Sequence, residues 1–264
     1  MWPILNFIMK GFILTIAALI GLCGGLAAQS FTPPTKEDLA AVENIIVEKY
    51  HVATSADIED TSTGHLAKGS VTYRIYVDLK PGYHLQAVFG VPGHPMFLKT
   101  STRFYNDLSG GFSGDQIWDE RLSQGNIALD SWLTIGVATR QRFAVPLTDD
   151  TDSSIIKKNG FEKADGLMPG GAVQKLLYYG TDLSMFGKDQ NANMFDSQNA
   201  SWAVVGGGKG PTKDNKVLIA QLTTNGKLSF ELNIQVGTPS GSMVQFVAKK
   251  PVKNEVQLKK LIYK

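Results

Sequence analysis

The fold of this chain is decided by the stretch SVTYRIYVDLKPGYHLQAVFG, residues 70–90. Successive side chains of a strand point to opposite faces, so apolar residues at every second position predict a strand with one buried face. The residues predicted to share that face are Val71, Tyr73, Ile75, Val77 and Leu79. The Lys-Pro-Gly sequence that follows ends the strand, because proline lacks a ladder donor and glycine accepts unusual dihedral angles. A second strand is expected in HLQAVFG.

The opposite face of this strand carries Arg74, Tyr76 and Asp78, and it has two interpretations. It is a binding surface, or it is a face that solvent and neighbouring strands satisfy. Residues two apart on one strand interact weakly, whereas pairs across neighbouring strands interact more strongly. We therefore expect a solvated or cross-strand-paired face, which needs no function to account for it.

A second strong signal lies near the C-terminus, where KVLIAQLT and KLSFELNIQVG flank Thr224-Asn225-Gly226. Asn-Gly between β-rich segments favours a type I′ turn, because that turn needs positive φ at both central residues. The sequence therefore predicts a hairpin here. In its second strand, the residues predicted to point inward are Leu228, Phe230, Leu232, Ile234 and Val236. Those predicted to point outward are Ser229, Glu231, Asn233 and Gln235.

Shorter β-rich segments fill much of the remaining chain. The residues predicted to share a face in ALDSWLTIGVA are Leu129, Leu133, Ile135 and Val137. A short helix is expected in TKEDLAAVENI, where Thr35 and Asp38 have the spacing of a capping box. With about ten strand candidates and no long amphipathic helix, the chain is predicted to be all-β, an antiparallel β-sandwich.

Residues 1–28 have the layout of a secretory signal peptide. Lys10 precedes the apolar segment GFILTIAALIGLCGGLAA, whose small final residues predict cleavage after Ala27 or Ala28. An uncleaved anchor helix is the alternative, but glycines disfavour it because each costs about 1 kcal/mol relative to alanine in a helix interior. Cys23 is the only cysteine, so neither a disulfide nor a cysteine metal site is expected in the mature protein.

The expected organisation is a signal peptide at 1–28, a leader with a short helix at 29–43, and a single β-rich domain at 44–264. After the first 28 residues no stretch approaches the roughly 18 apolar residues of a membrane span. The net charge of +2 and the scattered lysines do not form the basic patch that nucleic-acid binding needs. We expect a secreted or extracytoplasmic protein, located in the periplasm, at the cell surface or outside the cell.

The common catalytic motifs are missing. GGFSGD and GTPSGS both lack the Gly-x-Ser-x-Gly spacing of a hydrolase nucleophile. In GGGKGPT, Gly210 follows Lys209 where a phosphate-binding loop needs serine or threonine. No catalytic residue is therefore predicted, and a non-catalytic role is favoured. A glycan hydrolase with carboxylates dispersed along the chain is an alternative.

Acidic residues suggest one metal. Asp149, Asp150 and Asp152 gather in the loop PLTDDTDSS, and oxygen ligands in an irregular loop can hold calcium. The sequence DQNAN, from Asp189, imitates the opening of a calcium-binding EF-hand loop but lacks its later glycine and glutamate. The expectation is plain solvated loops and no cofactor, with a structural calcium ion as the alternative.

Aromatic residues give the candidate ligand contacts. The long polar excursion at 105–127 contains Phe112 and Trp118, and long loops are more often functional than ordinary connections. These two residues are the candidates for a platform that stacks on sugars. Trp132 and Trp202 lie in apolar surroundings and are expected in the core.

Four segments, TYRIYVDLKPGYHLQAVFG, ALDSWLTIG, NASWAVVGG and VLIAQLTTNGKLSFELNIQVG, occur in this order. Together they resemble a β-rich module of secreted and cell-surface proteins of the Bacteroidota, with looser relatives in planctomycetes. The resemblance covers roughly residues 44–250. It implies export and assigns no catalytic residue. The expected function is a secreted, non-catalytic surface or matrix protein, adhesion being one form of that role. A glycan-binding module is the alternative, so the expected partner is a cell-surface glycan or protein.

Overall fold

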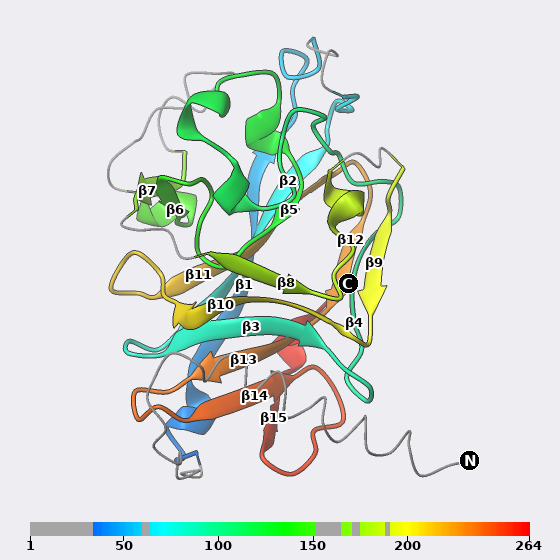
Figure 1. The fold of residues 1–264 in the computed structure, drawn as a ribbon. Coiled ribbons are helices and arrows are strands. Elements are labelled where there is room, and N and C mark those ends of the chain that lie inside the picture. Colours follow the sequence, from blue (N-terminus) through cyan, green and yellow to red (C-terminus); the bar gives the residue numbers. More distant parts are fainter. Residues whose placement is uncertain (1–33, 60–63, 151–164, 171–174, 188–190) are drawn as a thin grey trace, which may run out of the picture. The chain divides into compact units, whose positions relative to one another are not determined.

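The computed structural model describes residues 34–59, 64–150, 165–170, 175–187 and 191–264, all within the compact unit Pro34–Lys264 (Figure 1). The predicted signal peptide, with Ala27 and Ala28, lies outside these residues, and so does Asp152. The described part is mostly β: no helix in it reaches seven residues, and its strands form four sheets. The predicted β-rich character is therefore confirmed.

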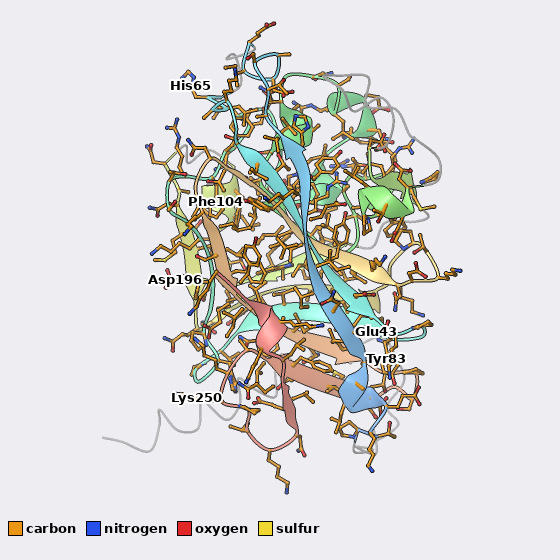
Figure 2. All side chains as sticks on the ribbon, turned by 180° about the vertical axis from the view of Figure 1, so that it is seen from behind. Glu43, His65, Tyr83, Phe104, Asp196 and Lys250 are labelled. Carbon is orange, nitrogen blue, oxygen red and sulfur yellow. The ribbon has the colours of Figure 1, made fainter. Side chains whose placement is uncertain are left out.

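The first sheet contains the strand that opened the sequence argument. Its order is β1 (Val42–Val52), β2 (Val71–Leu79), β11 (Lys216–Thr224) and β5 (Trp132–Leu133), with every pair antiparallel. The predicted strand at 71–79 is thus confirmed as β2. Figure 2 shows β1 in blue from behind, at the edge of this sheet, with Glu43 near its start.

The second and third sheets continue into each other. The second has the order β15 (Glu255–Gln257), β14 (Met243–Val247), β13 (Asn233–Gly237), β3 (His84–Gly90), β10 (Ala200–Gly208) and β8 (Leu176–Tyr179). The third has the order β16 (Ile262–Tyr263), β12 (Leu228–Glu231), β4 (Met96–Thr100) and β9 (Met194–Ser197). Three adjacent strands, β13, β3 and β10, connect directly along the chain to β12, β4 and β9. Only β14 and β15 pair in parallel among these strands.

Short elements complete the described residues. The fourth sheet pairs β6 (Arg142–Ala144) with β7 (Leu167–Pro169). The 3-10 helices are η1 (Asp38–Ala40), η2 (Gly114–Gln116), η3 (Asp119–Arg121), η4 (Ile127–Leu129), η5 (Leu147–Asp149), η6 (Leu183–Phe186) and η7 (Lys259–Leu261). Sixteen strands are present in the described residues rather than about ten, because several have only two to four residues.

The predicted capping box is present, but the helix that it begins is one turn long. The backbone N–H of Thr35 donates to Asp38 Oδ2 at 2.7 Å, and the N–H of Asp38 donates to Thr35 Oγ1 at 3.2 Å. These reciprocal bonds start η1, and β1 follows from Val42. β-branched residues dominate after that point, and they favour a strand over a longer helix.

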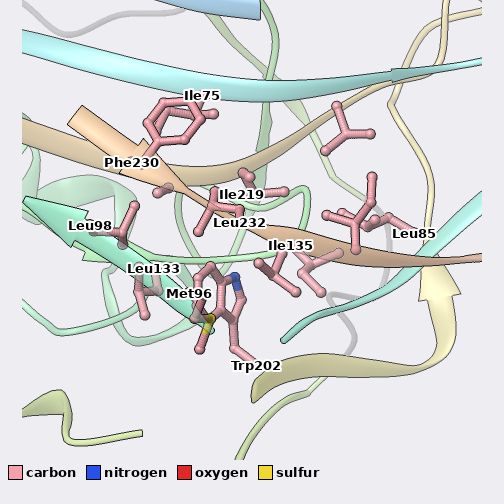
Figure 3. Close-up of a cluster of buried hydrophobic side chains, with 14 of the residues drawn as sticks. Ile75, Leu85, Met96, Leu98, Leu133, Ile135, Trp202, Ile219, Phe230 and Leu232 are labelled. Atoms are coloured by element: carbon pink, nitrogen blue, oxygen red, sulfur yellow. The ribbon is translucent and has the colours of Figure 1, made fainter. Parts of the chain in front are cut away.

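The main core lies where the apolar faces of the first three sheets meet (Figure 3). Its fully buried members include Ile75 and Ile219 of the first sheet, Leu85 and Trp202 of the second, and Phe230 of the third. The indole Nε1 of Trp202 donates to the carbonyl of Thr134 at 3.1 Å. The expectation that Trp202 and Trp132 are core residues is confirmed, since their exposed fractions are 0 % and 2 %.

The predicted Asn-Gly hairpin is wrong. β11 pairs with β2 and β5, whereas β12 pairs with β4 and β16, so the turn at 225–226 joins two different sheets. Neither Asn225 nor Gly226 has the positive φ of a type I′ turn. Thr102 Oγ1 donates to Asn225 Oδ1 at 2.7 Å, so contacts with the chain after β4 determine this turn. All five residues predicted to point inward are buried, but Glu231, Asn233 and Gln235 are buried as well.

The predicted strand at 128–138 is mostly irregular. Only Trp132–Leu133 pairs as β5, and Leu129 lies in η4. Leu133, Ile135 and Val137 belong to the main core, whereas Leu129 packs in a second cluster on the other face of the first sheet. The prediction that Leu129 shares their face is therefore wrong.

The outer face of β2 is buried, which overturns the expectation that solvent covers it. Arg74 is 2 % exposed and Tyr76 is 0 % exposed, because side chains from the regions 117–129 and 138–147 and from Leu167 pack over this face. Asp78, at the end of the strand, is only half-buried. The second cluster that forms here includes Tyr50, Tyr76, Ile117, Leu129, Trp132 and Leu218. The cross-strand pairing that was the other half of the expectation is present, because Arg74 Nε donates to Gln221 Oε1 of β11 at 3.0 Å.

Arg74 provides the positive charge of this buried face. Its Nη1 donates to the carbonyl of Gly166 at 3.0 Å, and its Cζ lies 3.5 Å from the centre of the Tyr50 ring. Glu48 lies opposite Arg74 in the β1–β2 register, and its Oε1 accepts a hydrogen bond from the N–H of Leu147 at 2.8 Å. Burial raises the pKa of Glu48 above its usual value, with Leu147 and Arg74 opposing the shift.

We expect Arg74→Ala to lower the free energy of unfolding by about 2–4 kcal/mol, because it leaves the buried acceptors Gln221 Oε1 and the Gly166 carbonyl without this donor, at about 1–3 kcal/mol each. Urea denaturation followed by circular dichroism measures this loss. Arg103→Ala is the matched control, since Arg103 is exposed and its loss changes stability by at most about 0.5 kcal/mol. A loss from Arg74→Ala as small as that of the control would contradict the role assigned to Arg74.

Candidate functional site

Trp118 is the exposed tryptophan of the described residues, with 47 % of its surface accessible. It lies between η2 and η3, directly after the buried residue Ile117. The carbonyl of Ile117 accepts a hydrogen bond from the N–H of Arg140 at 2.8 Å, and its side chain packs in the second cluster. The residue before Trp118 is therefore anchored on both its backbone and its side chain.

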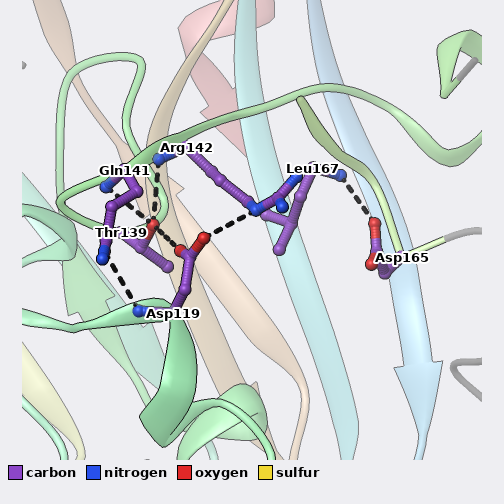
Figure 4. A network of polar contacts seen from close by, with 6 residues as sticks. All are labelled: Asp119, Thr139, Gln141, Arg142, Asp165 and Leu167. Atoms are coloured by element: carbon purple, nitrogen blue, oxygen red, sulfur yellow. Dashed lines mark hydrogen bonds and ion pairs between the residues drawn. The ribbon is translucent and has the colours of Figure 1, made fainter. Parts of the chain in front are cut away.

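The residue after Trp118 is fixed as well (Figure 4). Asp119 accepts a hydrogen bond from Thr139 Oγ1 and pairs with Arg142, whose Nε lies 2.7 Å from Asp119 Oδ2. The backbone N–H of Asp119 donates to Gln141 Oε1 at 3.1 Å. The turn at 139–142 thus holds Asp119, so the backbone is fixed on both sides of Trp118.

Arg140 completes the surface. Its Cζ lies 4.5 Å from the centre of the Trp118 ring, and its Nε donates to the carbonyl of Asp115 at 3.1 Å. A guanidinium over an exposed indole is worth about 0.5–1 kcal/mol, enough to favour one position of both side chains. We call Trp118 and Arg140 together the Trp118 surface. It offers an apolar aromatic ring beside a fixed cation.

Phe112, the other aromatic candidate, is not part of this surface. Its ring is half-buried and packs against the main core, and its carbonyl accepts a hydrogen bond from the N–H of Leu133 at 3.3 Å. Among the ring pairs of the described residues, none joins Phe112 to Trp118. The structure therefore separates the two residues that the sequence grouped together.

The acidic candidates have structural contacts instead. Asp149 pairs with Lys216 at 2.6 Å, and this hydrogen-bonded contact raises the pKa of Lys216. Asp150 Oδ2 accepts a hydrogen bond from the N–H of Gly166 at 2.9 Å. Within the described residues, no group of three or more histidine, cysteine, aspartate or glutamate side chains is placed to hold a metal ion. The calcium alternative also involves Asp152, which lies outside the described residues. It stays a prediction.

Two buried aspartates, Asp107 and Asp130, are joined through a backbone hydrogen bond in the interior. Asp130 Oδ1 accepts a hydrogen bond from the N–H of Asp107 at 2.8 Å, and the exposed fractions of the two residues are 0 % and 2 %. Burial raises the pKa of Asp130 well above its usual value. Because both residues are shielded from solvent, this pair does not offer a hydrolase its acid and base. The hydrolase alternative stays a prediction.

An open depression lies between η6 and β9. Its polar lining comes from Asp182, Ser184, Asn191, Asn193 and Asp196. Its apolar lining comes from Met185, Ala192, Met194 and Phe195. Asp182 accepts a hydrogen bond from the N–H of Ser184 at 3.0 Å and so caps η6. This depression contains neither an exposed aromatic ring nor a cation, so the Trp118 surface is the stronger candidate.

Sequence reasoning identified Trp118 but missed the residues that position it. Arg140, Gln141 and Arg142 lie in the segment TRQR, whose signal is a run of long polar side chains directly after an apolar segment. In the described part of the chain, no helix has the length and apolar character to cross a membrane. No protein family model, curated protein or solved structure matches this chain.

We expect Asp119→Ala to lower the free energy of unfolding by about 1.5–3 kcal/mol, since hydrogen bonds to a charged group contribute that much. Urea denaturation measures the loss. The matched control is Glu120→Ala, because Glu120 is an exposed carboxylate in the same turn. If the two variants are equally stable, the Asp119 contacts do not hold this loop.

Proposed function

We propose that this chain is a secreted, non-catalytic β-sandwich module that binds saccharides of a cell surface or matrix through the Trp118 surface. The single observation that carries the proposal is a tryptophan held between two fixed neighbours with 47 % of its surface exposed. Tryptophan and arginine are residue types enriched at binding hot spots, so an exposed Trp118 in contact with Arg140 favours a ligand-binding role.

The chemistry of the surface suits a sugar. One side of a pyranose ring presents C–H groups, which pack on an aromatic face, while its hydroxyls form hydrogen bonds around the edge. Trp118 supplies the ring, the exposed Glu120 follows it by two residues, and the exposed Arg140 contacts the ring in space. An aromatic side chain also buries a large area while few rotatable bonds are fixed.

The sandwich architecture is part of the proposal. It is supported by the main core, which receives side chains from the first sheet on one side and from the connected second and third sheets on the other. The extracellular location is supported by the order of charged, apolar and small residues in 1–28. The resemblance to exported modules points the same way.

We expect Trp118→Ala to weaken saccharide binding at least tenfold, which corresponds to about 1.4 kcal/mol. The purified protein and the variant are compared on a broad glycan array, and calorimetry then gives the affinity for each ligand found. Leu108→Ala is the matched control, because Leu108 is a 54 % exposed apolar residue of the same excursion. Unchanged affinity in Trp118→Ala, or no saccharide bound by the unmodified protein, would overturn the proposal.

We expect the exported protein to begin at Ala28 or Gln29. Intact-mass measurement of the protein recovered from the periplasm or medium of a bacterial host shows the position of cleavage. Ala27→Lys together with Ala28→Lys removes the small residues and should leave the precursor uncut. A protein that keeps residues 1–28 and stays in the cytoplasm would contradict the location.

A further inference from the structure

We infer that the Trp118 surface selects acidic saccharides, with Arg140 binding a carboxylate or sulfate group of the sugar. The inference rests on the proposed function and adds the charge of the ligand to it. It follows from the contacts that hold the Arg140 side chain and from the absence of an ion-pair partner for its charge among the described residues.

The guanidinium of Arg140 is held at Nε and Cζ, whereas its two terminal nitrogens face solvent. The Cζ atom lies over the Trp118 ring and Nε donates to the carbonyl of Asp115. The two terminal nitrogens have no hydrogen bond or ion pair with any residue that the structure describes, and the side chain is exposed. A guanidinium held in this way presents its planar donor pair to solvent at little entropic cost, and this pair matches the geometry of a carboxylate.

The carboxylates of two aspartates on either side of Trp118 have other partners. Asp115 accepts a hydrogen bond from the hydroxyl of Ser113 at 2.5 Å, and Asp119 is paired with Arg142. Arg140 contacts the backbone of Asp115 rather than its carboxylate. The positive charge of Arg140 is therefore not neutralised by an ion pair, and an anionic ligand would supply the missing partner.

Charge and ring together define the class of ligand. Because Arg140 covers part of one face of the indole, a single sugar ring is not expected to take both contacts. An oligosaccharide can place one sugar on the exposed part of Trp118 and the acidic group of a neighbouring sugar on Arg140. Uronate-containing and sulfated saccharides both carry such a group, whereas neutral glucans do not.

The test compares three ligands of similar length by calorimetry at low salt: a uronate oligosaccharide, a sulfated oligosaccharide and a neutral glucan oligosaccharide. We expect the unmodified protein to prefer one or both acidic ligands. Arg140→Gln should lose at least about tenfold more affinity for the preferred acidic ligand than for the neutral ligand, because both ligands lose the contact that positions Trp118 and only the acidic ligand loses its ion pair. Arg140→Lys keeps the charge without the planar donor pair. Its affinity for the acidic ligand should fall between those of the unmodified protein and Arg140→Gln.

Arg121→Gln is the matched control, because it removes a charge from η3 without touching the Trp118 ring. Its affinity for the acidic ligand should stay within about threefold of the unmodified protein. Equal losses for acidic and neutral ligands in Arg140→Gln, or equal losses in Arg121→Gln and Arg140→Gln, would overturn the inference. Such results would leave the proposed function standing as long as Trp118→Ala still weakens saccharide binding at least tenfold. Absence of any saccharide binding by the unmodified protein would overturn both.

Discussion

The buried guanidinium of Arg74 is the constraint on which much of this structure depends. A charge that is 2 % exposed at the centre of a sheet must be satisfied by other protein groups, because the cost of an unpaired buried ion is several kcal/mol. Gln221, the ring of Tyr50 and the carbonyls of Asp165 and Gly166 satisfy it. The last two belong to the segment that covers this face of the first sheet. These two carbonyls precede β7, which pairs with β6, and Arg142 of β6 contacts Asp119 beside Trp118. The buried charge and the candidate surface are therefore linked through the β6–β7 pair.

The part of the fold that could be predicted is the part that follows from local alternation. The strand at 71–79 and the inward-facing residues from Leu228 to Val236 needed only the period-two pattern. The outer face of β2 and the Asn-Gly turn could not be predicted, because their partners are far away in the chain. Gln221 is 147 residues from Arg74, and Thr102 is 123 residues from Asn225. At Arg74 the long-range contact takes the place of solvent. At Asn225 it takes the place of the type I′ geometry that the local sequence favours.

The candidate site shows the same division. The polar context of the excursion at 105–127 was enough to single out Trp118, since an indole in such a segment has little apolar surface to pack against. The pairing of Trp118 with Arg140 depends on how the turn at 139–142 returns to the loop, which no local pattern encodes. Phe112 had the same local context and still packs against the main core. Local composition thus identified the loop, and tertiary contacts decided which of its aromatic residues faces solvent.

The pairing of β2 with β11 also has a consequence for the order in which the chain folds. The two strands at the centre of the first sheet are joined by hydrogen-bonded residues 147 positions apart, so the entropy of closing that long loop is lost before their contacts form. The sheet cannot be completed on a ribosome, or at the exit of a translocation channel, until residues 216–224 have emerged. Until then β2 lacks one of its two neighbours, and its unpaired edge is free to pair with other chains.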